Sequence, residues 1–187
     1  MTEKILTCID SSYVRQTLKV SPDNRHVTYI AVKSGKWFVV MDGMEGKPYD
    51  KIGLTTLAFS PDSQHVAYGA KLGNKWFVVL DGQELERYDD IGGEPPVFSP
   101  NSQRLAYMAR EGNKWFAITD NEKEMVYDAY GKGSLTFSPN SERVAYGVRE
   151  GNKWLAVVDG KREKRYDIVG KVIFSPNSQR VAYGAAV

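Results

Sequence analysis

Aspartate recurs along this sequence at a spacing that could build a ring of carboxylates. The series consists of Asp10, Asp42, Asp81, Asp120 and Asp159. Carboxylates that converge on a channel would suit metal binding or acid–base chemistry. Three members, however, stand directly before a glycine, and Asp-Gly is a residue pair that tight hairpin turns favour. We therefore interpret the series as turn residues rather than as a catalytic or metal-binding ring.

The two histidines, His26 and His65, occupy equivalent positions in the period that the aspartates define. Arginine holds the same position further along the chain, at Arg104, Arg143 and Arg180. Arginine does not replace histidine as a zinc ligand, and no pair of cysteines accompanies these positions. The sequence therefore predicts no metal site and no cofactor.

Motifs for nucleophilic or phosphate chemistry are missing from the sequence, which has no Gly-x-Ser-x-Gly elbow and no glycine-rich phosphate loop. A glycoside hydrolase needs two carboxylates about 5–10 Å apart. Asp90 and Glu94 are the acidic pair that we would nominate, but both belong to one loop at 90–96 and do not span a channel. We expect no catalytic residues and no enzyme activity, and a glycoside hydrolase is the least favoured alternative.

An internal repeat must position these side chains. Ser-Pro begins each unit at 21, 60, 99, 138 and 175, and tryptophan recurs with the same period at Trp37, Trp76, Trp115 and Trp154. Each unit divides into four short strands separated by Ser-Pro, Gly-Asn and Asp-Gly turns. In the run at 75–81 both sets of alternating side chains are apolar, so both faces of the strand are covered. Four strands in about 40 residues is the period of a β-propeller blade.

The sequence predicts one all-β domain over 1–187, a five-bladed β-propeller with four antiparallel strands per blade. The full units are 21–59, 60–98, 99–137 and 138–174. The fifth blade is expected to combine 1–20 with 175–187, because Lys4–Asp10 aligns without a gap on Lys36–Asp42 and the C-terminal piece supplies only the first two strands. Tyr13 would then stand where Tyr49 stands. Such a Velcro closure would leave no unpaired strand edge to aggregate.

Composition narrows the classes of partner and the compartment. The chain has 25 basic and 23 acidic residues, a net charge of +2, which gives no sign of nucleic-acid binding. No apolar run is long enough to cross a membrane. The first ten residues lack a signal-peptide pattern, and Cys8 is the only cysteine, so a cytoplasmic location is favoured. We expect a monomer.

The segments FSPDSQHVAYGA at 59–70 and IFSPNSQRVAYGA at 173–185 resemble the WD-repeat-like propeller repeat of the TolB type. The resemblance covers nearly the whole chain. It implies a propeller that acts as a scaffold for protein–protein contacts, without a defined active site. The sequence departs from the common pattern because Ser63, Ser102 and Ser141 stand where glycine is more usual.

Variable loops between the fourth strand of one unit and the first strand of the next predict the binding face. Loops on a rigid scaffold are where binding residues concentrate. The predicted binding residues of this loop face are Tyr130, Lys132, Lys51, Lys171, Asp90 and Glu94. We expect this face to bind a protein or peptide, since an exposed tyrosine is a common interface anchor.

A carbohydrate-binding, lectin-like propeller with pockets between blades is the alternative. The repeated tryptophans would then be platforms on which sugars stack, whereas the other interpretation is packing between blades. Tryptophan exposed in every repeat would favour carbohydrate, and buried tryptophan would favour a protein partner.

Overall fold

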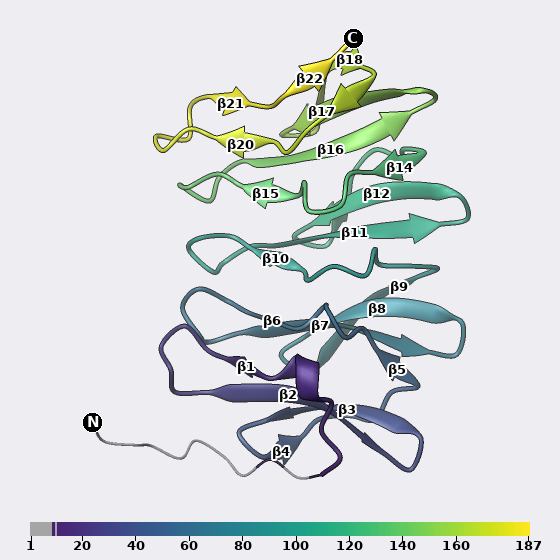
Figure 1. The fold of residues 1–187 in the computed structure, drawn as a ribbon, viewed down its shortest axis with the longest axis vertical. Helices are drawn as coiled ribbons and strands as arrows, with labels where there is room; N and C mark the ends of the chain where they lie inside the picture. The colour runs from purple at the N-terminus through teal and green to yellow at the C-terminus, as the bar shows by residue number, and fades with distance from the viewer. Residues whose placement is uncertain (1–8, 10) are drawn as a thin grey trace.

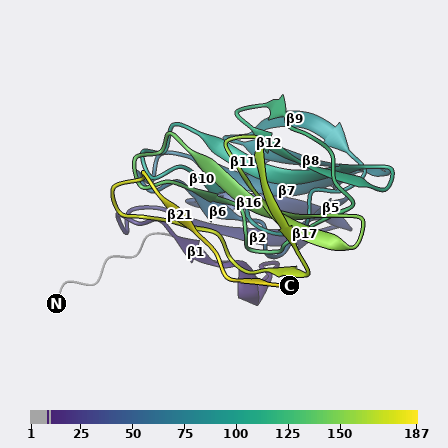
Figure 2. The ribbon, with the colours of Figure 1, turned by 90° about the horizontal axis from the view of Figure 1, so that it is seen from above.

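The computed structural model describes residue 9 and residues 11–187, and shows a stack of small antiparallel sheets. Figure 1 shows the first sheet at one end of the stack and the last strands at the other. Seen along the stack, the sheets overlap with a progressive rotation (Figure 2). One 3-10 turn, Arg15–Thr17, is the helical element of the described chain. No helix in this part of the chain is long and apolar enough to cross a bilayer.

The first and third sheets each contain four strands in sequence order. The first sheet consists of β1 (Lys19–Val20), β2 (Val27–Lys33), β3 (Lys36–Met41) and β4 (Met44–Glu45). The third consists of β10 (Val97–Phe98), β11 (Leu105–Glu111), β12 (Lys114–Thr119) and β13 (Glu122–Lys123). The predicted four-stranded antiparallel blade is therefore observed.

The second and fourth sheets have five strands because the innermost strand is broken into two pieces, both paired with the next strand. The second sheet consists of β5 (Lys51–Ile52), β6 (Ala58–Phe59), β7 (Val66–Leu72), β8 (Lys75–Leu80) and β9 (Gln83–Tyr88). The fourth consists of β14 (Ala129–Tyr130), β15 (Thr136–Phe137), β16 (Val144–Glu150), β17 (Lys153–Val158) and β18 (Lys161–Tyr166).

The C-terminal residues form the start of a fifth sheet in two small pairs. The first pair joins β19 (Ile168–Val169) to β22 (Ala185–Ala186), and the second joins β20 (Ile173–Phe174) to β21 (Val181–Ala182). Within the described chain, these strands pair with no strand of the first sheet. The predicted partner strand at 4–10 lies, apart from Ile9, outside the described residues. Ring closure and the count of five blades therefore stay predictions.

The segment before the first Ser-Pro belongs to the first sheet. Tyr13 bridges to Ala31, Val14 N–H donates to Ile30 O at 2.8 Å, and β1 pairs with β2. Ile52 makes the equivalent pairing with Ala70 in the second sheet, so the prediction that Tyr13 stands at the place of Tyr49 is wrong. Residues 11–20 follow the register of residues 50–59, so the gap-free alignment of Lys4–Asp10 on Lys36–Asp42 requires a connection seven residues shorter than in the other units.

The apolar core lies between successive sheets. Alternating residues of β8 supply both sides: Phe77 and Val79 pack in the cluster shared with the first sheet, and Val78 packs in the cluster shared with the third. In each full sheet the strand that follows the Ser-Pro turn begins with five buried residues; these strands are β2, β7, β11 and β16. The expectation that both faces of the strand at 75–81 are covered is thus confirmed, and burial on both faces stacks the second sheet between its two neighbours.

An aspartate joins each sheet to the next. Asp89 follows β9, and its Oδ1 accepts a hydrogen bond from Lys75 Nζ of the same sheet at 2.7 Å. Its Oδ2 accepts from Gly112 N–H, in the hairpin turn of the third sheet, also at 2.7 Å. Asp50 and Asp128 make the equivalent pairs of bonds at the neighbouring junctions. We call these three residues the junction aspartates.

A serine makes a second link between sheets and explains the departure from glycine. Ser102 has a left-handed backbone, with φ +64°, where glycine would be unstrained. Its Oγ accepts a hydrogen bond from Asp62 N–H of the preceding sheet at 3.0 Å. Ser63, Ser141 and Ser178 are also left-handed and accept equivalent bonds. Serine is present because glycine has no side chain to make this bond.

The repeated Asp-Gly positions are turn residues, as predicted. Asp81 has φ +49° and its Oδ1 accepts from Val66 N–H at 2.8 Å, which closes the end of the β7–β8 pair. Its Oδ2 lies 2.7 Å from His65 Nδ1. At the matching position of the third sheet Arg104 Nε donates to Asp120 at 2.7 Å. The same role, as partner of the turn carboxylate, is thus shared by His26, His65, Arg104 and Arg143.

Acid should weaken the junctions. The lysine ammonium, and next the glycine N–H, hold the pKa of each junction aspartate below its ordinary value. The folded chain therefore binds fewer protons than the unfolded chain, whose aspartate pKa is about 3.9. The stabilisation is present above that pH and is lost as the pH falls through the lowered pKa values. We expect the triple variant D50N/D89N/D128N to be less stable at pH 7 and to lose less stability on acidification, as urea unfolding at several pH values will measure.

Asp167 supplies the control for this measurement. It pairs with Lys153 at 2.6 Å in the same way, but no turn glycine of a following sheet binds it in the described chain. Asp167→Asn should therefore lower the free energy of unfolding at pH 7 less than Asp89→Asn does. Equal effects of the two single substitutions would show that the link between sheets adds nothing to the lysine pair.

Candidate functional site

One inner-edge position distinguishes the third sheet from its neighbours. In the second sheet Thr56 Oγ1 donates to Gly53 O and accepts from Gly69 N–H, which ties the inner loop to β7. Thr17 and Ser134 make the same two bonds in the first and fourth sheets. The third sheet has Pro95 at this position, and proline offers neither a hydroxyl group nor an N–H.

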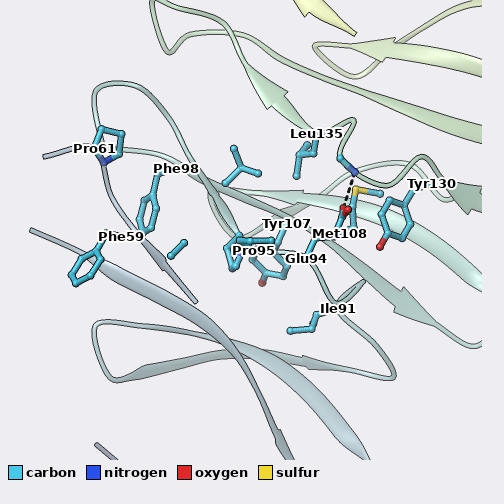
Figure 3. Close-up of a pocket in the computed structure, with 14 residues that line it drawn as sticks. Phe59, Pro61, Ile91, Glu94, Pro95, Phe98, Tyr107, Met108, Tyr130 and Leu135 are labelled. Atoms are coloured by element: carbon cyan, nitrogen blue, oxygen red, sulfur yellow. Dashed lines mark hydrogen bonds between the residues drawn. The ribbon is translucent and has the colours of Figure 1, made fainter. Parts of the chain in front are cut away.

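A cavity of about 370 Å³ opens at this place, and we call it the inner cavity. It extends along the inner edges of the second, third and fourth sheets (Figure 3). Its aromatic and aliphatic walls are Phe59, Phe98, Tyr107, Met108, Tyr130 and Leu135. Much of the remaining lining consists of three prolines, Pro61, Pro95 and Pro96. Concave apolar sites of this size, with few polar groups, are typical of ligand-binding pockets.

Hydrogen bonds between loops hold the rim of the cavity. Tyr130 Oη donates to Gly92 O at 2.7 Å, and Glu94 Oε2 accepts from Gly133 N–H at 3.0 Å (Figure 3 shows the second bond). On the other side Thr55 Oγ1 donates to Gly93 O at 2.6 Å. The loop at 90–96 is therefore fastened to the loops of both neighbouring sheets. A fastened rim presents a preformed site rather than a mobile one.

The electrostatic environment keeps the tyrosine hydroxyl neutral. Burial, and then the nearby carboxylates of Glu94 and Asp90, raise the pKa of Tyr130. Its ring lies against Trp115, with 4.7 Å between ring centroids. Asp90 Oδ1 accepts from the N–H groups of Ile91 and Gly92, so its carboxylate shapes the loop. Glu94 is thus the acidic group that lines the cavity.

The structure brings together two of the six residues predicted to bind. Tyr130 and Glu94 line the inner cavity, and Asp90 supports the same loop and pairs with Arg110 at 3.5 Å. The three predicted lysines are exposed and do not line it: Lys51, Lys132 and Lys171. A shared role for the three lysines therefore stays a prediction.

The phenylalanines in the walls of the cavity are not predicted as binding residues from the sequence, because they recur in several units. Phe59 and Phe98 occupy the same repeat position as Phe137, so their recurrence indicated packing. Phe137 is indeed buried, at 7% exposed, whereas Phe59 and Phe98 are half-buried beside the cavity. The consecutive prolines Pro95 and Pro96 in one unit were the available signal.

The tryptophans are neither platforms in open water nor core residues. All four are half-buried, and each lies opposite the tyrosine of its unit, as Trp76 lies opposite Tyr88. Lys71 lies 5.8 Å from the ring centre of Trp76, and Arg110 lies 5.6 Å from that of Trp115. The tryptophans are therefore neither fully exposed, which would favour a carbohydrate, nor fully buried, which would favour a protein partner. Among residues 9 and 11–187, no group of acidic, histidine or cysteine side chains could hold a metal ion.

Comparison with known proteins shows similarity in structure only. No family model matches the sequence, and the search of curated proteins found no relative. Similar solved structures include TolB from Acinetobacter baumannii (15% identity, TM-score 0.47), a eukaryotic initiation factor (12%, 0.50) and the Myceliophteria thermophila Cps50 (Swd1) β-propeller domain (13%, 0.47). They match 88%, 90% and 97% of this chain, which spans 47%, 50% and 65% of their lengths. The predicted propeller-type repeat is confirmed, and at these identities the likeness concerns the fold alone.

The geometry of the rim predicts that alanine substitutions at two adjacent glycines have different effects on stability. Gly92 and Gly93 both have left-handed backbones, with φ +77° and +70°. A Cβ on Gly92 would lie 2.5 Å from Tyr130 Oη, whereas a Cβ on Gly93 would meet nothing within 4 Å. Gly92→Ala should therefore lower the free energy of unfolding by about 1–3 kcal/mol more than Gly93→Ala, the range expected for overpacking. Urea unfolding of both variants measures the difference, and equal losses would contradict the contact with Tyr130.

Proposed function

We propose that this chain is a non-enzymatic scaffold that binds a protein or peptide partner through the inner cavity. One observation carries the proposal: among the four full sheets, the third has proline in place of the threonine or serine tie, and an apolar cavity opens there. A residue common to all sheets serves the fold, whereas a residue particular to one sheet is free to serve a ligand. The predicted residues Tyr130 and Glu94 lie on this cavity.

The shape and chemistry of the cavity favour a peptide side chain. A volume of about 370 Å³ is sufficient for one large apolar side chain and part of its neighbour. Walls of aromatic rings and prolines provide apolar contact area with little side-chain entropy to lose. The Glu94 carboxylate at the rim would favour a basic residue beside the anchor. We therefore expect a peptide with an aromatic or large aliphatic anchor next to lysine or arginine.

The carboxylates near the cavity support a binding role more than a catalytic one. Asp90 is held by two backbone N–H groups and by Arg110, and Glu94 is held by Gly133 N–H. Both come from one loop, whereas glycosidic catalysis needs two carboxyl groups on opposite sides of the scissile bond. Neither residue has a nucleophile or histidine bonded to it among the described residues.

Selection of peptides on the folded chain tests the binding site. Leu135 lines the cavity, and Leu18, at the equivalent position of the first sheet, is 42% exposed and lies outside it. We expect dodecapeptides selected from a phage-displayed library to bind wild type, to bind Leu135→Trp at least tenfold more weakly because the indole fills the cavity, and to bind Leu18→Trp normally. A tenfold change is about 1.4 kcal/mol, and titration calorimetry will measure it.

Two results would reject the site. Peptides that bind both tryptophan variants equally well would place the interface elsewhere. A library that yields no binder, together with capture of a glycan by wild type but not by Trp76→Ala on a glycan array, would favour the lectin-like alternative. Glu94→Gln should reduce only the preference for a basic residue in the peptide. Binding of the apolar anchor should stay unchanged.

The closed five-bladed ring also stays part of the proposal, and the single cysteine tests it. The alignment of Lys4–Asp10 on Lys36–Asp42 places Cys8 at the position of Val40, which pairs with Tyr29, and Tyr183 stands at the position of Tyr29. Directly paired strand residues are close enough for a disulfide. Mild oxidation of Tyr183→Cys should therefore give an intrachain disulfide in a monomer. A disulfide-linked dimer would show closure between two chains, and persistent free thiols would contradict the predicted pairing.

A further inference from the structure

The outermost strand of the fourth sheet has an unusual combination of length, charge and exposure. β18 has six residues, whereas the outermost strands of the first and third sheets, β4 and β13, have two. It is the end strand of its sheet, so its outer backbone groups pair with no other strand among the residues that the structure describes. Its sequence is Lys-Arg-Glu-Lys-Arg-Tyr, and the first five residues are exposed.

Charge is unevenly divided along the chain, and β18 lies in the basic part. The segment 143–187 contains nine basic and four acidic residues, a net charge of +5, so the remainder of the chain carries −3. Glu150 forms ion pairs with both arginines of the strand, at 3.1 Å with Arg162 and in a short contact with Arg165. Lys161 and Lys164 form no ion pair with any described residue. Two lysines are therefore available to an anionic partner.

The second sheet contains an internal comparison. β9 is the other six-residue outer strand, and it carries Glu84 and Glu86, with Arg87 paired to Glu84 at 3.0 Å. Charge of either sign protects an open edge from aggregation, so edge protection alone does not explain why β18 is basic. The contrast between two strands of equal length shows that the repeat tolerates either sign. Basic charge on β18 is thus a property of this sheet, not of the architecture.

We propose that β18 binds an extended acidic segment of a partner protein by strand addition to its open edge. Strand addition takes affinity from main-chain hydrogen bonds and specificity from side chains, and here Lys161 and Lys164 would select acidic residues. The charge favours this partner over a nucleic acid, because Glu150 and Glu163 interrupt the basic surface. It also favours it over a lipid surface, because the five exposed residues of β18 include no apolar side chain to insert. This site is independent of the inner cavity.

The test uses a labelled peptide of four Glu-Thr repeats and the full chain. Fluorescence anisotropy should show binding that weakens at least tenfold in K161E/K164E. The matched control K19E/K47E makes the same change in net charge at two exposed lysines outside β18 and should leave binding unchanged. The same peptide with every backbone nitrogen methylated keeps its charge but donates no main-chain hydrogen bond, and it should bind at least tenfold more weakly.

Several outcomes would overturn the proposal. Equal binding of the methylated peptide, or equal losses in the two double variants, would reduce the interaction to general charge attraction. Tighter binding of a DNA duplex or of phosphatidylserine vesicles through Lys161 and Lys164 would assign the strand to another class of partner. Sedimentation that shows self-association lost in K161E/K164E would assign the edge to a second copy. Leu135→Trp fills the inner cavity and leaves β18 unchanged, so this variant should bind the acidic peptide normally. The inner-cavity proposal and the β18 proposal can therefore fail independently of each other.

Discussion

The junction between successive sheets is the contact on which the rest of this molecule depends. Apolar burial draws the sheets together, but it is non-directional and leaves their relative rotation free. The junction aspartates remove that freedom, because one carboxylate accepts from a lysine of its own sheet and a glycine N–H of the next. The serine link does the same at the other end of the strands. Two directional bonds at separated points fix how each sheet sits on its neighbour.

Repetition of this junction makes departures from the repeat informative. Because every sheet must satisfy the same links, most positions are committed to the stack and vary little between units. Where the tie between inner loop and second strand is replaced by Pro95, the structural demand has been removed at one place only, and the inner cavity lies there. The outermost strands β9 and β18 pair with no described strand on their outer side, and their charges differ without disturbing the fold.

Some features of the candidate site were within reach of the sequence and others were not. The sequence predicts Tyr130 and Glu94 because each is particular to its own unit and belongs to a segment expected to be a variable loop. Both line the cavity, although Tyr130 lies in β14 rather than in a loop. Phe59 and Phe98 were missed because they recur, and recurrence alone does not distinguish a phenylalanine that is buried from one beside a cavity. The three lysines were grouped by charge, yet the stack leaves them exposed outside the cavity.

By itself the sequence determined the repeat, the all-β class and the burial of both strand faces, since a regular repeat of propeller-blade length with apolar residues on both faces has few other solutions. Tertiary structure decided the links between units. In the sequence Ser102 is only a departure from glycine, whereas the structure shows that its Oγ accepts from Asp62 N–H at 3.0 Å. In the sequence Asp89 is only half of a repeated Tyr-Asp pair, whereas the structure shows that its Oδ2 accepts from Gly112 N–H. Both partners come from another unit, and periodicity within one unit carries no information about contacts between units.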